Sequence, residues 1–161
     1  MRANPGGRGT VAVPAEDGMG KRFWICGIVM SFAALLWAFL THALLLQADY
    51  DALGAMYRDA ADGSRHFPWL LLAHALIGFA MTWIFGQGVS SERPTLAQGL
   101  RFGLAMALFS TVPGYLVHYA VQPLPPLLVA KQVASGILGM LLLGMLVAWL
   151  HPRRSVLAEP Q

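Results

Sequence analysis

The sequence predicts an all-α integral membrane protein, a bundle of four membrane-spanning helices with both termini in the cytoplasm. Apolar residues make up 57% of the chain and charged residues only 12%, whereas soluble domains carry roughly 25% charged residues. The mean hydropathy is +0.56. The apolar residues also form four long runs, separated by short segments rich in charge or proline. Because so few charges remain to face water, lipid is the expected solvent for most of the surface.

A four-span domain, 21–152, is expected between two cytoplasmic tails, 1–20 and 153–161. The first tail is rich in Gly, Pro, Ala and Arg without apolar periodicity, which predicts disorder. The first span, 23–46, contains no charged residue and, at about 1.5 Å per residue, exceeds the roughly 30 Å hydrocarbon core. It is too long for the apolar region of a cleaved signal peptide, so it is expected to remain as a signal anchor.

The loop 48–66 is the longest one and contains four aspartates. Tyr50, Leu53, Met56 and Tyr57 recur at helical spacing. The segment therefore forms either a short amphipathic helix at the interface or a helical extension of the first span. The aspartates lack the spacing of a calcium loop, and we expect them to be solvated.

The second span, 68–87, is predicted to start at Pro68, because proline at the first helical position has no N–H to leave unsatisfied. The third span, 97–121, and the fourth, 127–150, are joined by a tight turn with three prolines. Pro113 interrupts the third span. It predicts a kink satisfied by neighbouring hydroxyls, in preference to a broken helix with a binding site at the midplane.

The distribution of Lys and Arg predicts the orientation. Of 11 such residues, eight lie on the side of the two termini, and three (Arg58, Arg65 and Lys131) lie on the other side. By the positive-inside rule, both termini are cytoplasmic and the acidic loop is periplasmic. The basic residues flank the spans and form no basic face with interleaved aromatics, so we expect lipid and not nucleic acid as the partner.

Small residues spaced by four predict how the helices pack, because lipid gives helices no hydrophobic reason to associate. The third span and the second span each carry such a ridge. The same ridges are also suited to a homodimer, and the pattern does not separate the two uses. The predicted packing residues are Gly99, Gly103 and Ala107 in the third span, and Gly78, Thr82 and Gly86 in the second.

Three histidines are the main candidates for chemistry, since ionisable groups within a membrane are rare. His42, His74 and His118 lie about 5–9 Å inside the same end of three different spans, counted at 1.5 Å per residue. Gly78 and Gly114 lie one turn deeper than His74 and His118, which would leave room for a flat macrocycle. The hypothesis is that His74 and His118, or His42, ligate a b-type haem. Its propionates would lie near Arg58, Arg65 or Lys131.

The alternative is that these histidines form hydrogen bonds with neighbouring helices. They lack the pattern of a metal site, so the first expectation is that the chain has no cofactor. Lys131 is expected to extend to the headgroups. Cys26, the one cysteine, is expected to be a small buried residue. No catalytic motif is present, so no catalytic residue is predicted and we do not expect an enzyme.

Two runs resemble a group of small bacterial four-span proteins described as uncharacterised membrane proteins. They are PWLLLAHALIGFAMTWIFGQG and GLRFGLAMALFSTVPGYLVHYAVQPLPPLLVAKQ, and the resemblance extends over roughly 23–152. It implies four spans and a bacterial source, and it supplies no activity, cofactor or functional residue.

The sequence thus favours a non-enzymatic multi-pass protein of the bacterial inner membrane. We expect it to act through helix contacts, in a homo-oligomer or as an accessory subunit of a membrane complex. A haem- or metal-binding redox protein is the alternative, and a small transporter is the third hypothesis.

Overall fold

The computed structural model describes residues 17–58, 60–88 and 95–151. Its elements are all helical, and none of these residues is in a strand, so the predicted all-α class is confirmed. Four helices are long and apolar enough to cross a membrane: Gly20–Leu45, Ala61–Gly88, Leu96–Val121 and Pro126–Leu150. The predicted C-terminal tail and most of the N-terminal tail lie outside the described residues.

The first span is longer at its N-terminus than predicted and is not a regular α-helix throughout. Helix α1 (Asp17–Ala38) begins inside the segment expected to be disordered. Extending a helix that the apolar span has already nucleated adds one hydrogen bond per residue, which favours this extension. The span then continues as a π-helix, η1 (Phe39–Leu45), which the apolar pattern did not predict.

The loop after the first span takes a form between the two predicted alternatives. A short helix, α2 (Gln47–Asp51), follows Leu46, whose ψ of 3° separates it from the first span. A 3₁₀ turn, η2 (Gly54–Met56), comes next. Gly54, the first residue of this turn, has a φ of 52°, a conformation that glycine adopts without steric cost, and it separates the turn from α2.

The prediction that the second span begins at Pro68 is wrong. Helix α3 (Ala60–Gly88) begins eight residues earlier and contains Pro68 in its interior. Polar side chains of the added turns bond to backbone carbonyls: Ser64 Oγ donates to Ala61 O at 2.8 Å, and His66 Nδ1 donates to Asp62 O at 2.8 Å. Pro68 has no N–H for the carbonyl of Ser64, so the helix passes through it with one backbone hydrogen bond missing.

The third span is divided as Pro113 predicted. Helix α4 (Leu96–Met106) starts with a capping box between Thr95 and Gln98. A π-helix, η3 (Ala107–Thr111), then leads into α5 (Val112–Val121), which has Pro113 in its first turn. Ser110 Oγ donates to Met106 O at 2.7 Å, whereas the carbonyl that loses its donor to Pro113 is that of Phe109, so this bond is not the one that the prediction required. Helix α6 (Pro126–Leu150) follows the proline turn.

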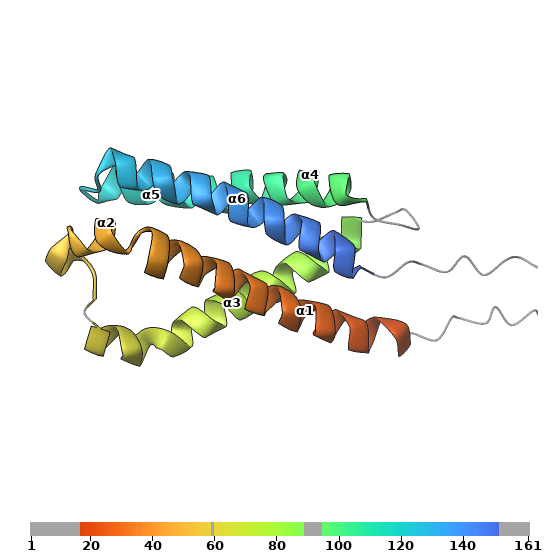
Figure 1. Cartoon of the computed structure of the whole chain (residues 1–161). Coiled ribbons are helices and arrows are strands. Elements are labelled where there is room, and N and C mark those ends of the chain that lie inside the picture. The colour runs from red at the N-terminus through yellow and green to blue at the C-terminus, as the bar shows by residue number, and fades with distance from the viewer. Residues whose placement is uncertain (1–16, 59, 89–94, 152–161) are drawn as a thin grey trace, which may run out of the picture.

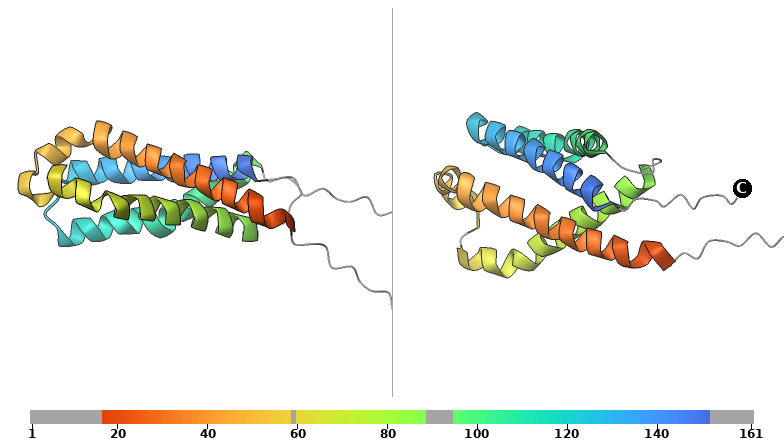
Figure 2. Two further views of the ribbon diagram at one scale, coloured as in Figure 1. Left: turned by 90° about the horizontal axis from the view of Figure 1, so that it is seen from below. Right: turned by 45° about the vertical axis from the view of Figure 1, so that its right-hand side comes forward.

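The helices form two pairs joined through α6. Helix α1 packs mainly against α3, and α4 packs mainly against α6, while α6 also contacts α1, α3 and α5. The start of α1, the end of α3, the start of α4 and the end of α6 lie at one end of the bundle (Figures 1 and 2). We call this the terminal end. The end that carries α2 and the turn between α5 and α6 is the loop end.

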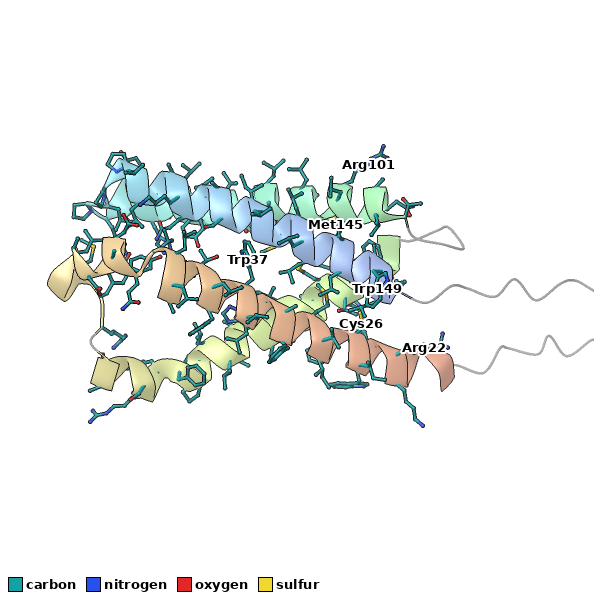
Figure 3. All side chains as sticks on the ribbon, viewed as in Figure 1. Arg22, Cys26, Trp37, Arg101, Met145 and Trp149 are labelled. Carbon is teal, nitrogen blue, oxygen red and sulfur yellow. The ribbon has the colours of Figure 1, made fainter. Side chains whose placement is uncertain are left out.

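Most of the apolar core lies toward the terminal end. It is formed by α1, α3 and α6, and its centre consists of Met30, Met81 and Val147, each at most 1% exposed. Cys26 belongs to this cluster and is buried, as predicted. Arg22 and Arg101 lie at the terminal end (Figure 3), which agrees with the grouping of cations used to predict orientation. Which end faces the cytoplasm stays a prediction.

Candidate functional site

Three of the four buried polar side chains among the described residues, those of Thr41, Gln132 and Ser135, lie toward the loop end. The fourth, Thr82, lies beside Cys26 in the apolar core. Both π-helices contribute to this region: η1 carries Thr41 and His42, and η3 carries Thr111. A π-helix inserts an extra residue per turn at a cost in regular hydrogen bonding, and such segments frequently occur at functional sites. The irregular backbone therefore points to the same region as the polar side chains.

His42 is at the centre of a hydrogen-bonded cluster. Its Nδ1 lies 2.6 Å from the hydroxyl of Tyr50, and its Nε2 lies 3.4 Å from the hydroxyl of Tyr115. Gln132 Nε2 donates to the Tyr50 hydroxyl at 3.0 Å. These four residues come from η1, α2, α5 and α6, so the network connects three spans with the loop helix. We call them the His42 cluster.

One arrangement of protons is consistent with all three of these contacts. The Tyr50 oxygen accepts from Gln132, and its hydroxyl donates to Nδ1 of His42, which then carries its proton on Nε2. The Nε2–H group points to the Tyr115 oxygen. The hydroxyl proton of Tyr115 is then left for another acceptor. Burial of Tyr50, which lies outside the spans, raises the pKa of its phenol above the ordinary value of 10.0, so it is neutral near pH 7.

An ion pair holds α2 against the fourth span beside this cluster. Lys131 Nζ lies 2.9 and 2.8 Å from the two carboxylate oxygens of Asp49. The side chains are 41% and 25% exposed, respectively. The sequence led us to expect a lysine extending to the headgroups. It instead neutralises an aspartate of the long loop, which had been expected to be solvated.

Two cavities adjoin the His42 cluster. The first has a volume of about 130 Å³ and lies between the spans, lined by apolar groups from α1, α3 and α6 together with His42, His74 and Tyr115. The second has a volume of about 390 Å³ and lies at the loop end. It is lined by three tyrosines (Tyr50, Tyr57 and Tyr115), two histidines (His42 and His118), two glutamines and a leucine. Because His42 and Tyr115 line both, the cavities are neighbours.

The predicted packing residues of the third span build the contact between α4 and α6. A Cβ atom at Gly99 would meet the carbonyl oxygen of Gly144, and one at Gly103 would meet the carbonyl oxygen of Met140. Ala107 is fully buried. This ridge is therefore occupied within the chain.

The second ridge packs α3 against α1. Gly78 lies against the backbone of Ser31, whose hydroxyl donates to Gly27 O at 2.7 Å and approaches Ala75 O at 3.3 Å. Thr82 is buried and donates to Gly78 O at 2.8 Å. Gly86 lies near the ring of His151, where an added Cβ would be 3.4 Å from Cε1.

The structure separates the haem candidates. The first cavity contains His42 and His74, and the second contains His42 and His118, so neither contains His74 with His118. His74 Nδ1 donates to Leu70 O at 2.7 Å, which leaves its Nε2 as an acceptor, whereas both nitrogens of His42 face tyrosine hydroxyls.

The space expected beside the ligand helices is only partly present. The space beside Gly78 is filled by Ser31, while Gly114 has no atom within 4 Å of an added Cβ. Among the described residues, no group of three or more His, Cys, Asp or Glu side chains could hold a metal ion.

Sequence reasoning missed three members of the site and one packing residue. Tyr50 had been considered only as part of the helical pattern of the loop, and Tyr115 and Gln132 were not singled out. Trp37 was also missed: its Nε1 donates to Ser135 O at 3.1 Å, its ring lies on Gly139, and it points into the bundle (Figure 3). A glutamine and two tyrosines near the ends of apolar runs were the available signal, but spacing along one helix cannot show which helices bring them together.

Comparison with protein-family models, with curated proteins and with solved structures finds no match to this chain. The resemblance to small four-span bacterial proteins is thus supported only in its coarser part, the four helices apolar enough to cross a membrane.

Proposed function

We propose that this chain is a membrane binding protein that holds a small hydrogen-bonding molecule in the cavity at the loop end. One observation supports this proposal above the others. Seven of the eight residues that line the cavity carry hydrogen-bonding side chains: three tyrosines, two histidines and two glutamines. A pocket that gathers so many donors and acceptors matches a molecule that forms several hydrogen bonds. Gln132 Oε1 has no hydrogen-bond partner among the described residues, but this atom is covered by the protein itself and does not face the cavity.

The proposal includes the expectations from sequence. The protein is non-enzymatic, has no resident cofactor, and lies in the bacterial inner membrane with both termini in the cytoplasm. The loop end and its cavity then face the periplasmic side. In this position the molecule can enter from the outer leaflet or from the periplasm.

Mass spectrometry of the chain released directly from native membrane vesicles tests the proposal. We expect the wild type to carry a bound non-protein mass. Tyr115→Leu removes a hydroxyl and a ring from the cavity, and the bound mass should be lost. Tyr119→Leu is the matched control, because Tyr119 lies one turn further along α5, is 43% exposed and does not line the cavity. A wild type without any bound mass refutes the proposal.

The second candidate function is assembly with another copy or with a larger membrane complex. The third span favours this candidate. In the most apolar 18-residue stretch of that span, only 11% is buried within the chain, against 22–28% in the other spans. Phe109 on this face is 80% exposed. In a Cys26→Ala background, oxidation of a Phe109→Cys variant should give a covalent dimer, and a Trp24→Cys variant should not. Monomers from both variants, with no subunit co-purifying, exclude this candidate.

The haem hypothesis has its own measurement. Under the proposal made here, the reduced-minus-oxidised absorption spectrum of the purified protein shows no Soret band. A Soret band that is lost in His74→Ala would replace the proposal with the redox function.

A further inference from the structure

The cavity between the spans lies at the depth of the hydrocarbon core. It is the smaller of the two cavities beside the His42 cluster, with a volume of about 130 Å³. Its lining includes Ala34, Ile77, Thr111 and Met140, and each of these residues lies near the middle of its candidate membrane span. At this depth the medium around the bundle consists of lipid acyl chains and not of water.

The helices around this cavity do not close it on the side between α3 and α5. Helix α1 packs against α3 and α6, and α6 packs against η3 and α5, but α3 has no comparable contact with η3 or α5 in the described part of the chain. Toward the loop end, α3 and α5 lie well apart (Figures 1 and 2). His74 of α3 and Tyr115 of α5 both line the cavity. An acyl chain of the surrounding bilayer can therefore enter between these two helices.

The wall of the cavity is suited to hydrocarbon. Ile77 and Leu143 contribute apolar side chains, and Trp37 contributes its ring. Polar groups beside them are bonded within the chain: Trp37 Nε1 donates to Ser135 O at 3.1 Å, and Ser135 Oγ donates to Lys131 O at 2.8 Å. An ordered water needs roughly two to four polar partners, so these internal bonds favour an apolar guest over water.

The volume of the cavity fits part of one acyl chain. Apolar cavities of about 150 Å³ take up a molecule as large as benzene, which corresponds to roughly six carbons of a chain. A chain that moves in from the bilayer displaces no water, so the hydrophobic effect contributes little. The gain is in dispersion contacts, because an empty space leaves the atoms of the wall without neighbours on one side.

On these grounds, we infer that the bundle holds a segment of one phospholipid acyl chain in the cavity between the spans, and that the chain enters between α3 and α5. This site is separate from the loop-end cavity of the proposed function, because Ala38, Ile77 and Leu143 line only the cavity between the spans. Each of the two proposals therefore stands or falls by its own measurement.

Photolabelling by a lipid tests the inference. The probe is a phosphatidylcholine with a diazirine at the middle of one acyl chain, and the full chain is placed in nanodiscs that contain it. Illumination attaches the probe to the residues it touches, which are identified by tandem mass spectrometry. We expect label on Met140 and on Trp37, which points into the bundle (Figure 3), as well as on the lipid-facing Leu36, which is 48% exposed. Met30, which is 0% exposed, should carry none. Label confined to Leu36 and other lipid-facing residues overturns the inference.

Filling the cavity should remove the internal label. Ala38 lines the cavity, and Ala38→Phe adds a ring of the size that such a space accepts, so the label on Trp37 and Met140 relative to Leu36 should fall roughly tenfold. Ala105→Phe is the matched control, because Ala105 is exposed on α4 and does not line the cavity, and it should keep the wild-type ratio. An unchanged ratio in Ala38→Phe also overturns the inference, and the wild-type result decides it whether or not this variant folds.

Discussion

The contact between α4 and α6 allows a prediction with a nearly matched control in the same span. Gly103→Ala and Gly114→Ala make the same chemical change, and both positions are helical. Alanine is more favourable than glycine in a helix by about 1 kcal/mol, so this gain is similar in both variants. The difference between them therefore reports on the space around each position.

The surroundings of the two glycines differ sharply. A Cβ at Gly103 would meet backbone atoms of α6, namely the carbonyl group of Met140 and the Cα of Leu141 at 2.9 Å. Backbone atoms of a helix cannot turn aside as a side chain can, so α4 and α6 must separate. A Cβ at Gly114 meets nothing within 4 Å. Overpacking by a methyl group typically costs about 1–3 kcal/mol, and we expect Gly103→Ala to be less stable than Gly114→Ala by this amount.

Unfolding in mixed micelles measures this difference. The dodecyl maltoside-solubilised protein is titrated with sodium dodecyl sulfate, and the loss of helix packing is followed by tryptophan fluorescence. Free energies of unfolding equal within about 0.5 kcal/mol for the two variants would refute the reasoning, because the ridge would then not lie against α6. The larger Gly103→Leu should also disturb any assembly, through the fold and not through a direct interface.

Three further predictions concern topology, pH and the ion pair. A fluorescent protein fused to the C-terminus should fluoresce and an alkaline phosphatase fusion there should be inactive, since the cations predict a cytoplasmic terminus; the opposite result reverses the orientation. Because burial raises the pKa of Tyr50 above 10.0, the folded state holds this proton more tightly than the unfolded state. The resulting stability is complete below pH 10 and is lost as the pH rises through the higher folded-state pKa. Between pH 9 and pH 12, the wild type should therefore lose more stability than Tyr50→Phe, as measured by circular dichroism. A double-mutant cycle of Asp49→Asn and Lys131→Met should give a coupling of about 0.2–1 kcal/mol, the range for partly exposed pairs, and no coupling would mean that the pair does not hold α2 in place.

Much of the architecture could be predicted from local sequence. Four apolar runs set the number and approximate position of the spans. The distribution of Lys and Arg assigned four helix ends to one side of the membrane, and the structure places those four ends together. Pro113 marked the interruption of the third span, because a residue without an N–H affects its own helix wherever that helix lies. Pro68 was misplaced by the same local reasoning, since polar side chains before it continue the helix.

The site itself depended on contacts between helices. Spacing along a span identified Gly103 as a packing residue but not α6 as its partner, and it placed three histidines at one depth without showing that only His42 faces two tyrosines. The pairing of Lys131 with Asp49 joins positions far apart in the chain. Hydropathy is a property of each segment and lipid responds to it segment by segment, so the sequence alone determines a four-span membrane protein. Which polar groups meet inside depends on how the spans rotate and pair, and this only the tertiary structure decides.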